Sequence, residues 1–200
     1  AINIVRSLGY KIRRPTINKS GVVWEIDDDN KTLIQPLTSV KGLGDKAVEQ
    51  VLNHRPFNTI EELLFNEEIV YSKLNKKALD VMTRCGALNE LMDGRFTGMK
   101  HFWSTVAVDR PKNEKKLLEN IELYRPEGDF TKWEKMEFLT ALTGIYPINE
   151  VITDKLLKKF DKLKVPPIGE FDKDLKLCWF IIRDVIEKKT KHGKIYWILK

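Results

Sequence analysis

The residues in this sequence whose types could do chemistry are two glycines around one leucine, Gly42-Leu43-Gly44, flanked by Lys41 and Lys46. Glycine lets the backbone take positive φ or approach another chain closely. The aspartate after the second glycine suits the first turn of a helix, whose leading amides have no partner within the helix. Such amides, with the helix dipole, attract an anion such as a phosphate. The two lysines add charge for the same ligand.

Apolar spacing predicts the elements that position this turn. Leu37 and Val40 are three residues apart, as on a short helix, and the run 47–52 has helical spacing after the glycines. Two helices joined by such a turn form a helix-hairpin-helix, which would hold duplex DNA by its phosphates and read no sequence. The alternative is an ordinary pair of packed helices in which the glycine is a cap.

Composition bounds the class of protein. The chain has 200 residues, 42% hydrophobic and 32% charged, which fits one or two folded domains. No apolar run has the length of a membrane span and no signal peptide opens the chain, so we predict a cytoplasmic protein without a membrane partner. Cys85 and Cys178 lie in apolar surroundings and are expected to be free thiols. The three histidines lack zinc-site spacing, and no phosphate-binding Walker loop is present.

The net charge of +6 is concentrated at one end of the chain. Residues 151–200 hold thirteen Lys and Arg against seven Asp and Glu, which accounts for the whole excess. A basic region of this kind suggests a polyanionic partner, and a lysine-rich solvated surface is the alternative.

Turn and cap residues predict the remaining elements of the first half. We expect a β-hairpin over about 22–35. Thr59 is expected to cap a short helix, with Glu62 completing a capping box. Further helices are predicted over about 75–86 and 96–108.

In the second half, residues 112–128 are polar and predict a linker or a domain edge. A helix is predicted over 133–142, with four residues inward: Trp133, Met136, Phe138 and Leu139. Asn149 or Thr153 is expected to cap a lysine-rich helix over about 153–162.

Two β-strands, 175–185 and 195–199, are predicted on either side of a basic turn. We expect its lysines to contact single-stranded DNA or the phosphate backbone: Lys188, Lys189, Lys191 and Lys194. Aromatic residues flank the turn and would stack on bases or form core: Trp179, Phe180, Tyr196 and Trp197. Strand alternation places Tyr196 and Trp197 on opposite faces.

Five segments, in the same order, resemble the C-terminal part of the bacterial DNA polymerase III alpha subunit, a C-family replicative polymerase. They are Leu8–Ile12 with Pro15–Ser20, Val40–Gly44, Asn75–Leu79 with Gly86–Leu88, Glu137–Ile148 and Lys189–Lys194. The resemblance implies a mainly α fold: a helix-hairpin-helix bundle with a small N-terminal β-hairpin and a partial OB-fold ribbon at the C-terminal end. It divides the chain into the end of the fingers (1–36), a tandem helix-hairpin-helix region (37–111), a linker and helical connector (112–165) and the start of the OB-fold (166–200).

The resemblance also implies that the palm aspartates of the polymerase lie upstream, so no catalytic or metal-binding residue is expected in this chain. The whole polymerase would be a Mg-dependent nucleotidyltransferase, and the hairpin would accept a monovalent cation. The function implied for this chain is non-catalytic holding of duplex or primer-template DNA.

Departures from the family pattern concern the partner sites. Tyr146-Pro147 stands where the family has His-Pro, and Gln35 and Gln50 lie outside the region expected for a clamp-binding peptide. Leu123-Tyr124 or Phe130 could substitute for that peptide, although core or surface packing is the alternative for each. A divergent, phage-encoded relative would show this pattern. The second functional hypothesis is a protein-interaction module that docks a sliding clamp or another replisome subunit.

Overall fold

The computed structural model describes residues 4–5, 8–27, 30–148, 151–170, 172, 174, 176–182 and 185–199. The chain forms two compact units, Ala1–Pro147 and Ile148–Lys200, called here the N-terminal and the C-terminal unit. Their boundary lies within the predicted connector, and our four-segment division stays a prediction. Parts of two expectations lie outside the described residues: the cap at Asn149 and stretches of the strand 175–185.

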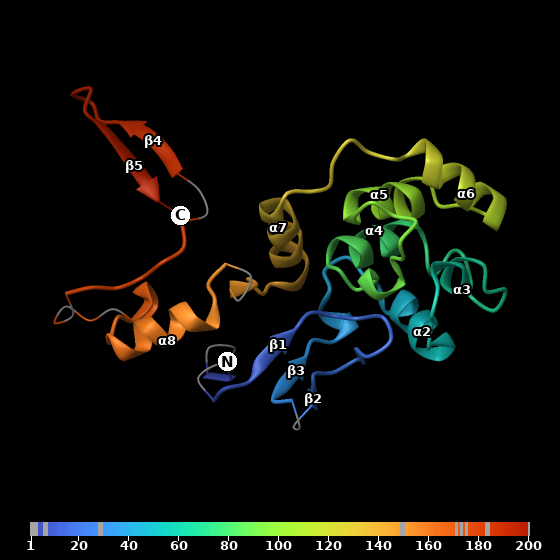
Figure 1. Ribbon diagram of the computed structural model, residues 1–200, viewed down its shortest axis with the longest axis horizontal. Coiled ribbons are helices and arrows are strands. Elements are labelled where there is room, and N and C mark those ends of the chain that lie inside the picture. Colours follow the sequence, from blue (N-terminus) through green and yellow to red (C-terminus); the bar gives the residue numbers. More distant parts are fainter. Residues whose placement is uncertain are drawn as a thin grey trace. The chain divides into compact units, whose positions relative to one another are not determined.

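The N-terminal unit opens with a small sheet of three strands, β1 (Lys11–Arg13), β2 (Glu25–Asp27) and β3 (Thr32–Ile34). The strand order is β1-β3-β2 (Figure 1). The predicted β-hairpin is confirmed, because β2 and β3 pair antiparallel with Ile26 opposite Leu33. β1 adds a parallel partner to β3, which local sequence patterns did not predict.

The glycine turn joins a short 3-10 helix, η1 (Leu37–Ser39), to α2 (Asp45–His54). Both elements face the core of the N-terminal unit, where Leu37, Val40 and Val51 are fully or almost fully buried. The predicted helix-hairpin-helix is therefore present, with its first helix shortened to a single 3-10 turn.

Two capped helices, α3 (Ile60–Leu64) and α4 (Lys76–Arg84), complete the central part of this unit. Asn75 caps α4 by accepting a hydrogen bond from the Ala78 N–H at 3.0 Å. Thr59 caps α3, but the Glu62 carboxylate accepts from the Asn58 N–H at 2.6 Å, so the predicted capping box is not closed. α4 packs against α5 (Met99–Trp103), the π-helix η3 (Ser104–Val108) and α7 (Lys132–Thr143), which places it at the centre (Figure 1). A further 3-10 turn, η2 (Asn89–Leu91), follows α4.

The predicted linker over 112–128 is wrong, because α6 (Glu114–Leu123) occupies most of it. Asn113 caps this helix by accepting from the Lys116 N–H at 2.8 Å. Its buried side is a narrow stripe of Leu117, Asn120 and Ile121, and the remaining residues are polar or exposed. An asparagine inside the stripe hides the helical pattern from a reading of apolar spacing.

α7 forms where we predicted a helix, with Met136 and Leu139 buried as expected. Trp133 is 57% exposed, so its predicted inward position is wrong. Phe130, just before the helix, packs edge-on against Phe138 with ring centroids 5.0 Å apart.

The C-terminal unit contains α8 (Asp154–Lys162), the 3-10 turn η5 (Ile168–Glu170) and a ribbon of β4 (Val185–Lys189) and β5 (Ile195–Leu199). Thr153 caps α8 as predicted. The first predicted strand is placed too early in sequence, because Trp179 pairs with Pro167 in an isolated bridge instead of joining the ribbon. The C-terminal ribbon itself is confirmed, and its membership of an OB-fold stays a prediction.

Both cysteines are free, as predicted. Burial raises the pKa of the Cys85 thiol to about 12, so this side chain acts as an inert core residue. None of the described helices is long and apolar enough to cross a membrane.

The cap of α6 generates a stability prediction. Asn113→Ala removes the acceptor for the Lys116 N–H and should lower the free energy of unfolding by about 1 kcal/mol. Asn113→Asp keeps an acceptor and should retain that stability. Urea unfolding followed by circular dichroism measures both.

The control is Asn53→Ala on α2, where the asparagine is exposed and makes no side-chain hydrogen bond to the described residues. Its stability should stay equal or rise slightly, because alanine favours a helix interior. Equal stabilities of Asn113→Ala and the wild type would contradict the capping role.

Candidate nucleic-acid interface

The two glycines of the bend differ in conformation and in role. Gly42 has φ +83°, a left-handed conformation that side chains other than glycine adopt at a cost. Gly44 has φ −76° and ψ 153°, which any residue can adopt, and it is the N-cap of α2. A Cβ added at Gly44 would meet nothing within 4 Å, so this glycine leaves open space in front of the helix.

Several amides at the bend are unpaired. Among the described residues, the N–H groups of Gly42, Gly44, Asp45 and Lys46 find no hydrogen-bond acceptor, and all four residues are exposed. The Ala47 and Val48 amides instead turn back to the Gly44 carbonyl at 2.9 and 3.1 Å. The bend therefore presents a group of donors to solvent, which is the arrangement that binds an oxyanion.

Leu43 has a different role from the one predicted. Its N–H donates to the Val40 carbonyl at 3.1 Å, and its side chain is only 6% exposed. Its amide is therefore unavailable to a ligand, and the side chain anchors the bend in the core. The Lys41 amide donates to the Leu142 carbonyl at 2.7 Å, so this residue offers only its exposed side chain.

An open depression of about 680 Å³ lies in front of the bend. One wall is the bend itself and the first turn of α2, with Gly42, Gly44 and Lys46. The other wall is the loop before α4 and the first turn of that helix. It is lined by Ser72, Lys73, Asn75, Lys77 and Ala78. Three lysines thus border the depression against the single carboxylate of Asp45.

Sequence reasoning missed the second wall. Asn75 was predicted to start a helix, but nothing in its local pattern shows that this start faces Gly44, some thirty residues earlier. Lys77 in this wall lies 3.4 Å from Asp80, a weak ion pair on an exposed lysine. The described part of the chain gives the ammonium groups of Lys46 and Lys73 no ion pair.

Two buried glutamines hold the walls in place. Gln35 donates from Nε2 to the Thr143 carbonyl at 3.0 Å, which ties the sheet to the end of α7 beside the Lys41 contact. Gln50 Oε1 accepts from the Val70 N–H at 2.7 Å, which ties α2 to the loop that forms the second wall. Both side chains therefore serve the fold.

A buried arginine fixes the same loop. The Arg110 guanidinium lies over the Tyr71 ring, 4.0 Å from its centroid, and donates to the Leu74 carbonyl. No carboxylate among the described residues pairs with it, and burial lowers the pKa of Arg110 below its usual range. Because Leu74 precedes the α4 cap, this contact positions Asn75 and the lysines beside it.

The helix α4 also carries a charged cluster around Asp80. Its carboxylate accepts from Arg84 Nη2 at 2.7 Å and from Trp103 Nε1 at 2.9 Å. Partial burial alone would raise the pKa of Asp80, but the hydrogen bonds from Arg84 and Trp103 outweigh it and hold the pKa below its usual value. The cluster fixes α4 against α5 and so fixes the second wall.

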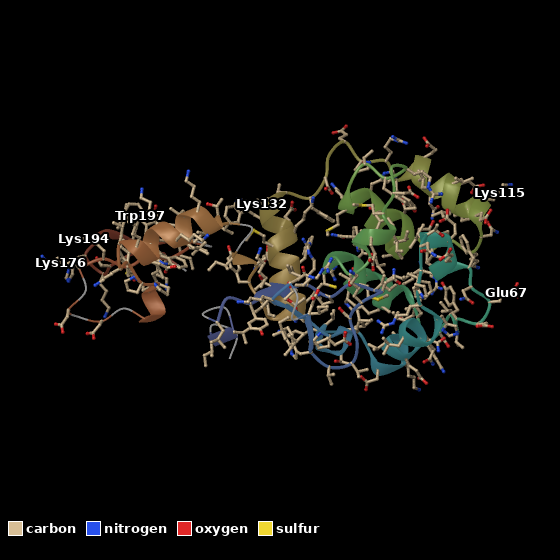
Figure 2. The ribbon with its side chains drawn as sticks, turned by 60° about the horizontal axis from the view of Figure 1, so that its bottom comes forward. Glu67, Lys115, Lys132, Lys176, Lys194 and Trp197 are labelled. Atoms are coloured by element: carbon tan, nitrogen blue, oxygen red, sulfur yellow. The ribbon has the colours of Figure 1, made fainter. Side chains whose placement is uncertain are left out.

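The second predicted lysine cluster lies in the C-terminal unit. Lys188 and Lys189 belong to β4, whereas Lys191 and Lys194 belong to a turn closed by the Thr190 N–H donating to the Lys194 carbonyl at 2.9 Å. The four lysines are exposed. Figure 2 labels Lys194 and Trp197 in this unit.

The ribbon register confirms one prediction about the aromatic residues and overturns another. Tyr196 pairs with Lys188 and Trp197 with Glu187, so the two rings occupy opposite faces as expected. Trp197 is 59% exposed. Trp179 and Phe180 do not flank the ribbon, and Trp179 stacks on Phe160 of α8 at 5.5 Å.

Comparison with known proteins identifies the class to which the bend belongs. Residues 9–98 match the family model of the helix-hairpin-helix motif, a range that includes both walls of the depression. The chain therefore carries a helix-hairpin-helix motif.

The chain is similar to several DNA polymerases. It is 28% identical over 156 residues to the DNA polymerase III subunit alpha of Thermotoga maritima, which covers 76% of this chain and 18% of that protein. It is 29% identical over 109 residues to the subunit of the same name from Pseudomonas aeruginosa, covering 52% of this chain and 9% of that protein. The DNA-directed DNA polymerase of Bacillus phage SPbeta is 28% identical over 124 residues, or 60% of this chain and 9% of that protein.

These matches confirm the predicted resemblance to the DNA polymerase III alpha subunits. One of the similar polymerases is encoded by a phage. The chain spans less than a fifth of the length of each of the three relatives.

The Asp80 cluster generates a prediction about pH. An aspartate side chain has a pKa of about 3.9 in an unfolded chain. The pKa of Asp80 in the folded protein is lower. The folded state is therefore stabilised above about pH 4, and this stabilisation disappears as the pH falls through the folded pKa. Asp80→Asn should cost about 1.5–3 kcal/mol at pH 7, as expected for hydrogen bonds to a charged group, and much less at pH 2 to 3.

Urea unfolding at pH 7, 4 and 2.5 measures this difference. Glu127→Gln is the control, because Glu127 is exposed and has no ion pair or hydrogen bond to the described residues. If the cost of Asp80→Asn were the same at all three pH values, the ionised carboxylate would not be the stabilising form.

Proposed function

We propose that this chain is a non-catalytic part of a replicative DNA polymerase that holds duplex or primer-template DNA by its phosphate backbone. The observation that carries the proposal is the exposed bend, where the amides of Gly42 and Gly44–Lys46 have no acceptor among the described residues and belong to residues that line a depression bordered by lysines. The helix-hairpin-helix match and the polymerase relatives support it.

In the proposed complex, a phosphate of one strand occupies the depression. It accepts hydrogen bonds from the amides at Gly44 and Asp45, while Lys46 and Lys73 approach from either wall. Lys41 reaches a neighbouring phosphate with its side chain. Because no base edge is involved, binding is independent of sequence and weakens steeply as salt rises.

We place the four ribbon lysines on the same DNA, as contacts to a single strand or its backbone: Lys188, Lys189, Lys191 and Lys194. The whole polymerase would supply the nucleotidyl transfer and its Mg, in the cytoplasm of a bacterium or of a phage-infected cell. The fingers, connector and OB-fold assignments of the four segments belong to this proposal.

Among the segments considered for docking a sliding clamp, the alternative function, Leu123-Tyr124 keeps an exposed side chain, with Leu123 at 67%. Both glutamines are buried and bonded within the fold. Phe130 packs in an aromatic group with Trp103 and Phe138. We therefore keep the DNA-holding function as the conclusion.

Gly44 permits a test that separates folding from binding. Its conformation suits any residue, and aspartate is among the best N-caps, so Gly44→Asp should fold with equal or higher stability. The new carboxylate would compete for the α2 amides and repel phosphate. We expect the affinity for a labelled 20-base-pair duplex to fall about tenfold or more at 0.1 M salt, a loss of about 1.4 kcal/mol.

Asn113→Asp is the matched control, because it adds the same charge at the N-cap of α6. Its affinity should change by less than about twofold, the size of a weak exposed charge effect. Unchanged duplex binding by a folded Gly44→Asp variant would overturn the proposed function.

A further inference from the structure

The lysines of α8 lie on one side of the helix. Lys155, Lys158, Lys159 and Lys162 follow the spacing i, i+3, i+4 and i+7, which places side chains on a common helical face. We call this set the α8 lysine face. The apolar residues of the helix, such as Leu157 and Phe160, fall on the other side.

The α8 lysine face is exposed, and its ammonium groups form no ion pair with the residues that the structure describes. The four side chains make no ion pair or hydrogen bond with any side chain described for this chain. Some lysines of other helices are paired, since Lys116 lies 3.7 Å from Asp109 and Lys135 is paired with Asp129. Like charges at this spacing destabilise an isolated helix. The helix dipole favours only the two lysines of the last turn, Lys159 and Lys162.

The opposite side of α8 is anchored within its own unit. The Phe160 ring stacks on Trp179, with centroids 5.5 Å apart and an angle of 16° between the rings. Backbone hydrogen bonds hold Trp179 there, since its N–H donates to the Pro166 carbonyl and its carbonyl accepts from the Ile168 N–H, both at 2.9 Å. The Phe160 part of the apolar side is thus covered, although Leu156 on the same side is 39% exposed.

We propose that the α8 lysine face is a second DNA-backbone contact, separate from the glycine bend and its depression. The four lysines extend over about 10.5 Å of helix, which matches about three phosphates along one strand. Ammonium groups are compact charges that bind phosphates without reading bases. The proposal extends the proposed DNA-holding function to a surface on the other unit.

An anionic membrane is a weaker match for this helix. A helix that lies in a membrane interface inserts its apolar side, and here Trp179 covers the Phe160 part of that side. We therefore commit to DNA and treat membrane binding as an outcome of the test.

The test replaces Lys155, Lys158, Lys159 and Lys162 by Gln in the full 200-residue chain. Binding of labelled duplex and of a labelled single strand is measured between 0.05 and 0.3 M salt. We expect the slope of log K against log salt to become shallower by about 3, near 0.9 per lost duplex contact or 0.7 per lost single-strand contact. The arm with the larger change identifies the form of DNA that α8 contacts.

Two further variants make the result specific. Replacing Lys31, Lys112, Lys115 and Lys132 by Gln removes the same net charge from exposed lysines of the N-terminal unit and should change the slope by less than about 1. Lys115 and Lys132 are labelled in Figure 2. Replacing the α8 lysines by Arg keeps the charge and should retain the wild-type slope, which excludes misfolding as the cause of a loss.

The outcomes separate this proposal from the proposed function. Loss of binding by Gly44→Asp, with equal slopes for the α8 Gln variant and the charge-matched control, would overturn the α8 contact alone. Loss by the α8 Gln variant, with Gly44→Asp unaffected, would support the α8 contact and overturn the bend. If the wild-type chain bound neither the duplex nor the single strand, both the α8 contact and the proposed function would be overturned. Binding to phosphatidylglycerol vesicles that depends on the α8 lysines, with DNA binding unchanged, would also overturn the α8 contact.

Discussion

The structure depends on a bend whose backbone is fixed by contacts with the core, while the amides of Gly42 and of residues 44–46 find no acceptor among the described residues. The Leu43 side chain is buried in the core, and the Lys41 amide is bonded to the Leu142 carbonyl at the end of α7. These contacts hold the positive φ of Gly42 and leave the first turn of α2 facing solvent. Unpaired amides on an exposed helix start cost little in water, and a phosphate can replace that water with hydrogen bonds that are already aligned.

The supporting contacts come from distant parts of the chain. α7 supplies carbonyls to Lys41 and Gln35, while Arg110 and Gln50 hold the loop before α4. Asn18 adds a further tie, because its side chain both donates to the Phe57 carbonyl and accepts from the Phe57 N–H. The helix-hairpin-helix is thus a local motif whose geometry is maintained by the whole N-terminal unit.

Part of the fold and of the candidate site could be predicted from the sequence, because it depends on residues that are close together in the chain. The two glycines, the helical spacing after them, the helix start at Asn75 and the cap at Thr153 each depend on a few neighbouring residues, and each was predicted. The second wall could not be found, because its approach to the bend depends on the packing of α4 rather than on the residues of the loop. α6 was not predicted, because Asn120 interrupts the apolar residues of its buried stripe. The side-chain amide of Asn120 donates to the Asp109 carbonyl. β4 was placed too early because an apolar run around Trp179 resembles a strand but stacks on α8.

The central claim is that individual backbone amides at the bend bind DNA phosphate. Nuclear magnetic resonance of the ¹⁵N-labelled chain during titration with a short duplex tests it directly, since each amide is observed separately. We expect the resonances of the Gly42, Gly44, Asp45 and Lys46 amides to shift strongly, while those of the internally bonded Leu43 and Val48 amides shift much less. Strong shifts elsewhere in the chain, with these four amides unmoved at saturating DNA, would contradict it.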